Sequence, residues 1–343
     1  GETKQEQENQ QENQQENQQE QPTEEETSSP ALLRTPASAA AADSHNPHCI
    51  CGLTHKEIGN HKTEDTDAFT DAKELKMEED GTLKKGGSDW TITRVDDKYN
   101  CLKLDDSNGG SYYLGTDLTL KKGYSILISG SVTLCLNGKN IVCEEEADDQ
   151  HVISVGAFGY DNAHLTLTDC QTTAGTINGG RKASTVVNLY GGCGLDMYGG
   201  TITGGGTGVS VDNKCTFNMH GGSTITGNSG YGVYMAAGTF NMYGGTISNN
   251  KNSGVYVPGG TFTMTGGEIT NNTANREGGG VYVWDGTFNM SGTAKITSNT
   301  TNITGGGVYV GKKFSGGTFN MEGGEISDNK AIEGGGPCGG GVY

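Results

Sequence analysis

One short motif is repeated six times between residue 191 and residue 343, and this repeat constrains the fold more than any other feature. Its clearest copy reads GTFNMYGGTISNN, residues 238 to 250, and is followed by GVYV at 254 to 257. Each copy places a large apolar residue two positions before a methionine, at successive intervals of 22, 23, 22, 26 and 31 residues. A motif that recurs at this interval indicates a solenoid, in which each unit buries its apolar face against its neighbours.

Within each copy, apolar residues alternate with small or polar ones, as in Phe262 with Met264 and Val281 with Val283. A period of two is the spacing of β-strands, not of helices. Glycine pairs and triplets separate the predicted strands, where a sharp bend or a positive φ is needed. Three strands per repeat, stacked at roughly 4.8 Å per coil, predict an all-β, single-stranded parallel β-helix.

A β-helix stacks equivalent positions, so each aligned position becomes a column of side chains along the axis. The predicted inward columns are Leu195, Phe217, Phe240, Phe262, Phe288 and Phe319; Met197, Met219, Met242, Met264, Met290 and Met321; Ile202, Ile225, Ile247, Ile269, Ile296 and Ile326; and Val233, Val255, Val281, Val308 and Val342. An asparagine column follows the isoleucines, at Asn228, Asn250, Asn272, Asn299 and Asn329. An inward amide at a bend can bond to the turn backbone and to the amide one coil away. We interpret this column as a structural ladder, and a ligand site is the alternative.

A tyrosine column alternates with the inward valines and should therefore point outward. It consists of Tyr234, Tyr256, Tyr282, Tyr309 and Tyr343. Mutual stacking that stabilises the sheet is one interpretation of this row. The other is a glycan platform, because sugars bind to aromatic faces, and Tyr234, Tyr256, Tyr282 and Tyr309 are the candidate contacts.

Two cysteines occupy equivalent positions of adjacent predicted coils. Cys193 and Cys215 each lie two residues before the first apolar position of their copy. They should be neighbours at a separation compatible with a disulfide, which secretion would favour. A stacked pair of free thiols is the alternative.

A Cys/His-rich segment precedes the repeats and reads HNPHCICGLTHKEIGNH from residue 45 to residue 61. The candidate ligands in it are His48, Cys49, Cys51, His55 and His61. Zinc favours four such nitrogen and sulfur donors, although Cys-x-Cys differs from the usual finger spacing. Zinc is thus the candidate cofactor, and a disulfide, an intermolecular cross-link or simple solvation are the alternatives.

Composition divides the chain into four parts. Residues 1–47 are rich in Gln, Glu, Asn and Ala and should form a disordered tail. Residues 48–66 hold the Cys/His-rich segment, and residues 67–110 should form a cap with a short helical piece at DAFTDAKELKM and a strand pair at DWTITRV and NCLKLDD. Residues 111–343 form the β-helix, which is regular from about 191; its last strand is open, which suggests a longer natural chain.

The charge distribution and the columns argue against several function classes. The net charge of −18 disfavours nucleic acid and anionic membranes as partners, and no apolar run is long enough to span a bilayer. Catalysis of polysaccharide cleavage needs clustered carboxylates. Glu268, Lys295 and Glu325 instead alternate in charge, and Asp196 has no second acid in its column. The loops after the isoleucines lengthen toward the C-terminus and should gather on one edge, a candidate partner surface.

The order of motifs YYLGTDLTL, VTLCLNGKNI, LTLTDC and then GTFxMxGGxIxxN with GGGVYV resembles the right-handed, pectate-lyase-like β-helix surface proteins of Gram-positive gut bacteria. Those families often carry an HxxCxCGxxHxxxGxH stretch near the start, as at His45 to His61. The resemblance implies secretion and display at the cell wall, and it brings no established activity. We therefore expect a non-catalytic extracellular scaffold of the adhesion type, with a surface glycan or protein as its partner. Glycan binding is the first alternative, and polysaccharide cleavage is the second.

Overall fold

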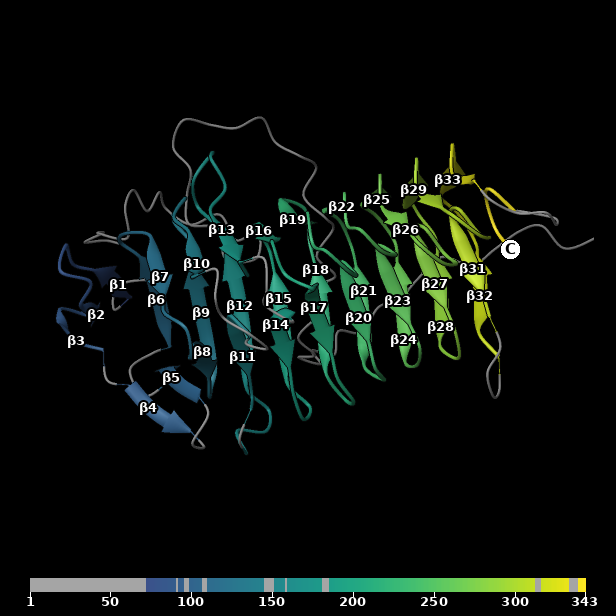
Figure 1. Ribbon diagram of the computed structural model, residues 1–343. Coiled ribbons are helices and arrows are strands. Elements are labelled where there is room, and N and C mark those ends of the chain that lie inside the picture. The colour runs from purple at the N-terminus through teal and green to yellow at the C-terminus, as the bar shows by residue number, and fades with distance from the viewer. Residues whose placement is uncertain are drawn as a thin grey trace, which may run out of the picture. The chain divides into compact units, whose positions relative to one another are not determined.

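The computed structural model describes residues 72–90, 92–95, 99–106, 110–144, 151–157, 159–180, 185–311, 316–332 and 339–343. Every regular element in these residues is a β-strand (Figure 1). The chain visits three sheets in the order A, C, B and repeats this path through about eight complete coils, from β6–β7–β8 to β28–β29–β31. The predicted parallel β-helix is therefore confirmed.

Sheet A contains, in spatial order, β3 (Ser88–Asp89), β2 (Leu83–Lys85), β1 (Lys73–Met77), β6 (Ser111–Leu114), β9 (Ser131–Cys135), β12 (His164–Thr168), β15 (Gly194–Met197), β18 (Thr216–Met219), β21 (Thr239–Met242), β24 (Thr261–Met264), β28 (Thr287–Met290) and β32 (Thr318–Met321). Sheet C contains β7 (Leu118–Leu120), β10 (Ile141–Cys143), β13 (Thr176–Asn178), β16 (Gly200–Thr203), β19 (Ser223–Thr226), β22 (Thr246–Ser248), β25 (Glu268–Thr270), β29 (Lys295–Thr297) and β33 (Glu325–Ser327).

Sheet B contains β4 (Ile92–Val95), β5 (Tyr99–Leu104), β8 (Tyr124–Ile128), β11 (Ile153–Val155), β14 (Thr185–Leu189), β17 (Thr207–Val211), β20 (Val233–Met235), β23 (Val255–Val257), β27 (Val281–Val283) and β31 (Val308–Val310). A short fourth sheet, sheet D, is made by β26 (Thr273–Ala274), β30 (Thr300–Thr301) and β34 (Lys330–Ala331). Its strands come from the lengthening loops, which therefore do gather at one corner, between sheets C and B.

The predicted columns pair residue for residue between adjacent coils. In sheet A, Phe240 lies opposite Phe217 on one side and Phe262 on the other, and the methionines and isoleucines follow the same register. The stacked phenylalanine rings lie 4.6 to 4.9 Å apart from Phe217 to Phe319. These side chains are buried up to Phe288 and Met290, whereas Met321 in the last described coil is 46% exposed. One continuous apolar core thus runs along the axis.

The irregular first coils follow the same columns. Leu165 of β12 lies opposite Leu195, and Ile177 of β13 lies opposite Ile202. Leu165 and Ile177 are fully buried. The stack therefore begins well before the regular repeat.

The short helix predicted within residues 67–77 is wrong for the part that the structure describes. Lys73–Met77 forms strand β1, which pairs in parallel with β6 and places Leu75 in the core. Backbone pairing and burial override the local helix propensity of this segment. The strand pair is confirmed, because β4 and β5 run antiparallel and β5 then pairs in parallel with β8. Antiparallel strands β2, β3 and β4 lie at the N-terminal edges of sheets A and B (Figure 1).

Two predicted segments lie outside the described residues, namely the tail at 1–47 and the Cys/His-rich segment at 48–66. In the described part of the chain, no helix has the length and apolar character to cross a lipid bilayer.

Candidate functional site

The asparagine column forms a continuous buried hydrogen-bond ladder. The Oδ1 atom of Asn250 accepts from the backbone N–H and from Nδ2 of Asn228, at 3.1 and 2.9 Å, and the same pair of bonds joins Asn250 to Asn272. It continues through Asn299 to Asn329. The Nδ2 atoms of Asn272 and Asn299 also donate to isoleucine carbonyls of the preceding coil, at 3.0 and 2.8 Å. These amides use their donors and acceptors within the stack, which confirms the structural ladder.

The outward tyrosines form a continuous aromatic surface on sheet B, which we call the tyrosine face. It consists of Tyr231, Tyr234, Tyr256, Tyr282, Trp284, Tyr309 and Tyr343. Successive ring centroids lie 4.8 to 5.6 Å apart from Tyr234 to Tyr343. Sequence reasoning missed Tyr231 and Trp284, because neither belongs to the repeated column.

The rings of the tyrosine face pack on one another, so their faces are partly covered and the row is half-buried except at Tyr343. Burial raises the pKa of Tyr256, Tyr282 and Tyr309, and the Glu277 carboxylate raises each of them further. Arg276 acts in the opposite direction on Tyr231. Arg276 and Glu277 come from the loop between β26 and β27, so the predicted loop edge and the predicted tyrosine row border the same surface.

A second polar cluster lies on the outer side of sheet A. The Asp196 carboxylate accepts from Nδ2 of Asn218 at 2.6 Å and lies 3.0 Å from Nε2 of His164. Asn241 extends the row, since its Nδ2 donates to Oδ1 of Asn218 at 2.9 Å. Burial raises the pKa of Asp196, but the hydrogen bonds from His164 and Asn218 outweigh burial and lower it overall. The sequence analysis found no second acid in the column of Asp196 and did not identify His164 as its partner.

Three aromatic rings form a short ladder just beyond the ends of these sheet A strands, at Tyr198, His220 and Tyr243. The centroids of Tyr198 and His220 are 4.1 Å apart and those of His220 and Tyr243 are 5.1 Å apart, all in stacked geometry. Burial lowers the pKa of the His220 imidazole, and the Asp196 charge opposes this only in part. His220 is consequently neutral at pH 7.

The predicted disulfide between Cys193 and Cys215 is not formed, and both residues are buried free thiols. They do lie in adjacent coils, because the Thr216 N–H donates to the Cys193 carbonyl at 3.0 Å. The Cys193 thiol donates instead to the Tyr160 carbonyl at 3.5 Å. Burial raises the pKa of both thiols and raises that of Cys143 to about 11, which disfavours the thiolate form at neutral pH.

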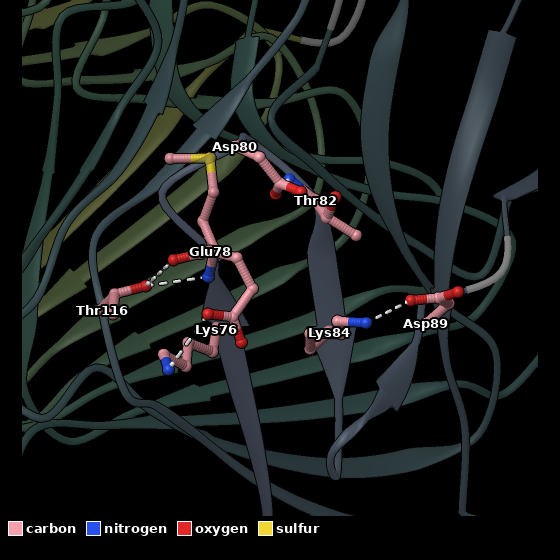
Figure 2. Close-up of polar contacts among 8 residues, drawn as sticks. Lys76, Glu78, Asp80, Thr82, Lys84, Asp89 and Thr116 are labelled. Atoms are coloured by element: carbon pink, nitrogen blue, oxygen red, sulfur yellow. Dashed lines mark hydrogen bonds and ion pairs between the residues drawn. The ribbon is translucent and has the colours of Figure 1, made fainter.

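A surface hollow of about 690 Å³ lies beside the β1–β2 hairpin. Its lining residues are mostly charged or polar, namely Lys76, Met77, Glu78, Glu79, Asp80, Thr82, Lys84 and Thr116. Several of their side chains pair locally (Figure 2): Lys76 with Glu78 at 3.3 Å, Lys84 with Asp89 at 2.5 Å, and Thr116 as acceptor from the Met77 N–H at 2.9 Å. Exposed pairs of this kind are weak, and the hollow is a shallow, open surface depression and not an enclosed cavity.

The alternating charges on sheet C form a ladder, as the sequence indicated. Glu268, Lys295 and Glu325 lie opposite one another in successive coils, and Lys295 Nζ is 3.9 Å from the Glu325 carboxylate. Glu268 accepts from the Thr297 hydroxyl at 2.8 Å. Each carboxylate is thus engaged with a neighbouring side chain.

The candidate zinc ligands His48, Cys49, Cys51, His55 and His61 lie outside the described residues. Within the described ranges, no group of three or more His, Cys, Asp or Glu side chains is arranged to hold a metal ion. Zinc at the Cys/His-rich segment stays a prediction.

Comparison with known proteins assigns no family to the chain. No protein-family model matches it, and neither the curated proteins nor the solved structures include a significant match. The β-helix itself is shown by the structure, and the likeness to surface proteins of gut bacteria stays an expectation from motif order.

Proposed function

We propose that this chain is a non-catalytic, extracellular or cell-wall-associated β-helix of the adhesion or surface-display kind, which presents the tyrosine face to a protein partner. The observation that carries this proposal is the continuous aromatic row from Tyr231 to Tyr343, which is half-buried as far as Tyr309. Tyrosine and tryptophan are enriched at protein interfaces and at their energetic centres. The loop residues Arg276 and Glu277 supply a charged rim beside it.

The non-catalytic part of the proposal is supported by the way the outward carboxylates are engaged. Asp196 is bonded to His164 and Asn218, and Glu268 to Thr297. Cleavage of a glycosidic bond requires two carboxyl groups that flank the substrate. The engagement of Asp196 in an Asp–His–Asn row and of Glu268, Lys295 and Glu325 in an alternating-charge ladder supports the non-catalytic proposal.

A double substitution in the tyrosine face tests this proposal. Labelled Tyr256→Ala/Tyr282→Ala protein should bind to bacterial or epithelial cell surfaces at least tenfold more weakly than the unaltered chain, measured by flow cytometry. The matched control is Thr224→Ala/Thr246→Ala, a pair of neighbouring outward positions on sheet C. Equal binding by the aromatic double variant and the unaltered chain would reject the tyrosine face as the contact surface.

Glycan binding by the same face is the second candidate, and the position of Glu277 favours it. Its carboxylate lies near the phenols of Tyr256, Tyr282 and Tyr309, and sugar sites commonly combine aromatic rings with carboxylates. Protease treatment of the target cells should abolish binding if the partner is a protein. Binding that survives protease but is lost after periodate oxidation of surface glycans would favour this second candidate.

A further inference from the structure

The ring ladder Tyr198–His220–Tyr243 departs from the repeat. Backbone hydrogen bonds place these residues and Thr265 at equivalent positions of successive coils, directly after the inward methionines or their equivalents. The later coils of the described chain carry Thr265, Ser291 and Glu322 there. The solenoid therefore does not require a ring at this position, and the three rings need another explanation.

The ring ladder stops at Tyr243, whose next neighbour along the axis is Thr265. The ring of Tyr243 stacks on His220 on one side only, and its side chain is 48% exposed. Threonine is far smaller than an aromatic ring. Because Thr265 occupies less space than a ring would, one face of the Tyr243 ring is left open to a ligand.

The polar row of sheet A stops at the same coil. Asn241 donates to Asn218, and Thr263 occupies the next position in register. The row resumes one coil later, where Asn320 donates to Oδ1 of Asn289. The interrupted position is consequently flanked by Oδ1 of Asn241 and Nδ2 of Asn289, two groups that form no hydrogen bond with any residue in the described part of the chain.

The ring ladder and the polar row end at the same coil, and together they define the chemistry of a ligand. The open Tyr243 ring suits the C–H face of a sugar ring, and a sugar hydroxyl can donate to Asn241 Oδ1 and accept from Asn289 Nδ2. A carboxylated sugar suits this surface less, because the chain carries a net charge of −18 and Asp196 lies on the same row. A neutral sugar meets no such repulsion.

We infer that the interrupted step at Thr263 and Thr265 is a binding subsite for a neutral pyranose, with Tyr243 as the stacking platform and Asn241 and Asn289 as hydroxyl partners. This site is on sheet A and is independent of the tyrosine face on sheet B. Its failure and that of the proposed function are therefore distinguishable.

Titration of the full chain with neutral oligosaccharides tests the inference. Gluco-, manno- and galacto-oligosaccharides, with oligogalacturonate for comparison, are added to ¹⁵N-labelled protein while the amide signals of Tyr243 and Thr265 are followed. We expect at least one neutral oligosaccharide to shift both signals, and oligogalacturonate to bind more weakly. Tyr243→Ala should weaken that binding about tenfold through loss of the stacking platform.

A variant that fills the proposed subsite distinguishes a blocked site from a loss of binding caused by damage to the fold. Thr265→Tyr retains Tyr243 but adds a fourth ring where the ligand would lie, so it should abolish sugar binding while the thermal midpoint stays at or above that of the unaltered chain. Tyr256→Ala, on the other sheet, should bind sugar normally. The inference is overturned if no neutral sugar shifts these signals, if oligogalacturonate binds more tightly, or if Thr265→Tyr binds as well as the unaltered chain.

Discussion

At the residue scale, the buried asparagines stabilise the stack because each amide oxygen accepts from two donors of the preceding coil. In Asn250→Ala, the backbone N–H and Nδ2 of Asn228 lose their acceptor. Buried donors left unpaired make the variant less stable by about 3 kcal/mol. Denaturant unfolding measures this change against Asn320→Ala, which removes a similar but exposed bond to Asn289 and should cost about 0.5 kcal/mol or less. Equal losses in the two variants would contradict a structural role for burial of the ladder.

His220 makes the stability of the stack depend on pH, and the direction of this dependence can be predicted. Burial lowers the pKa of its imidazole below the unfolded value of about 6.5. The unfolded chain therefore binds a proton first, and the contribution of neutral His220 to stability is present above pH 6.5 and lost as the pH falls below it. Relative to His220→Phe, which keeps a ring but cannot titrate, the unaltered chain should lose more thermal stability between pH 7.5 and pH 5. Parallel curves for the two proteins would show that His220 is not responsible.

The residue-scale contacts differ in how well the sequence predicts them. The asparagine ladder was predictable, because its members recur at one position of the repeat and bond to their equivalents in the next coil. The bond between His164 and Asp196 was not, because Asp196 lies opposite Thr166 and His164 lies opposite Gly194. The histidine reaches diagonally across the space that Gly194 leaves, where a Cβ would overlap its ring. Such a contact depends on side-chain reach and not on column identity.

At the element scale, the glycine directly before each of the strands β20, β23, β27 and β31 is required for close packing of the turn. A Cβ on Gly254 would lie 2.6 Å from Cγ2 of Ile269 and 2.8 Å from Nδ2 of Asn272. Gly254→Ala should therefore lower the free energy of unfolding by about 1 to 3 kcal/mol through overpacking. Gly221→Ala is the matched control, because a Cβ there meets nothing within 4 Å, and its effect should stay within about 0.5 kcal/mol. A harmless Gly254→Ala would show that the coils can separate at this corner.

Pairing between strands also explains why the first described strand was mistaken for a helix. Charged and apolar residues in KELKM allow either structure, and no repeat partner is visible in the sequence. Strand β1 is selected by pairing with β6 in parallel and with β2 in antiparallel orientation. Strands within the repeat were predictable because six copies share the same pattern, whereas the segment that forms β1 occurs only once in the sequence.

At the scale of the whole molecule, the register of the coils creates every surface discussed above. It aligns the tyrosines of sheet B, the polar row and ring ladder of sheet A, and the loop strands of sheet D. The columns and the outward direction of the tyrosines followed from the repeat alone. An interruption in a row can be interpreted as a binding position only when the side chains of both neighbouring coils are located.

Methyl NMR tests this register most directly. With ¹³C-methyl-labelled methionine, Met242 should show nuclear Overhauser contacts to both Met219 and Met264, because the coils stack at roughly 4.8 Å. Met242→Leu should remove both cross-peaks and leave the contact between Met264 and Met290 in place. Contacts from Met242 to methionines two coils away, or no contacts between neighbouring methionines, would contradict the in-register β-helix.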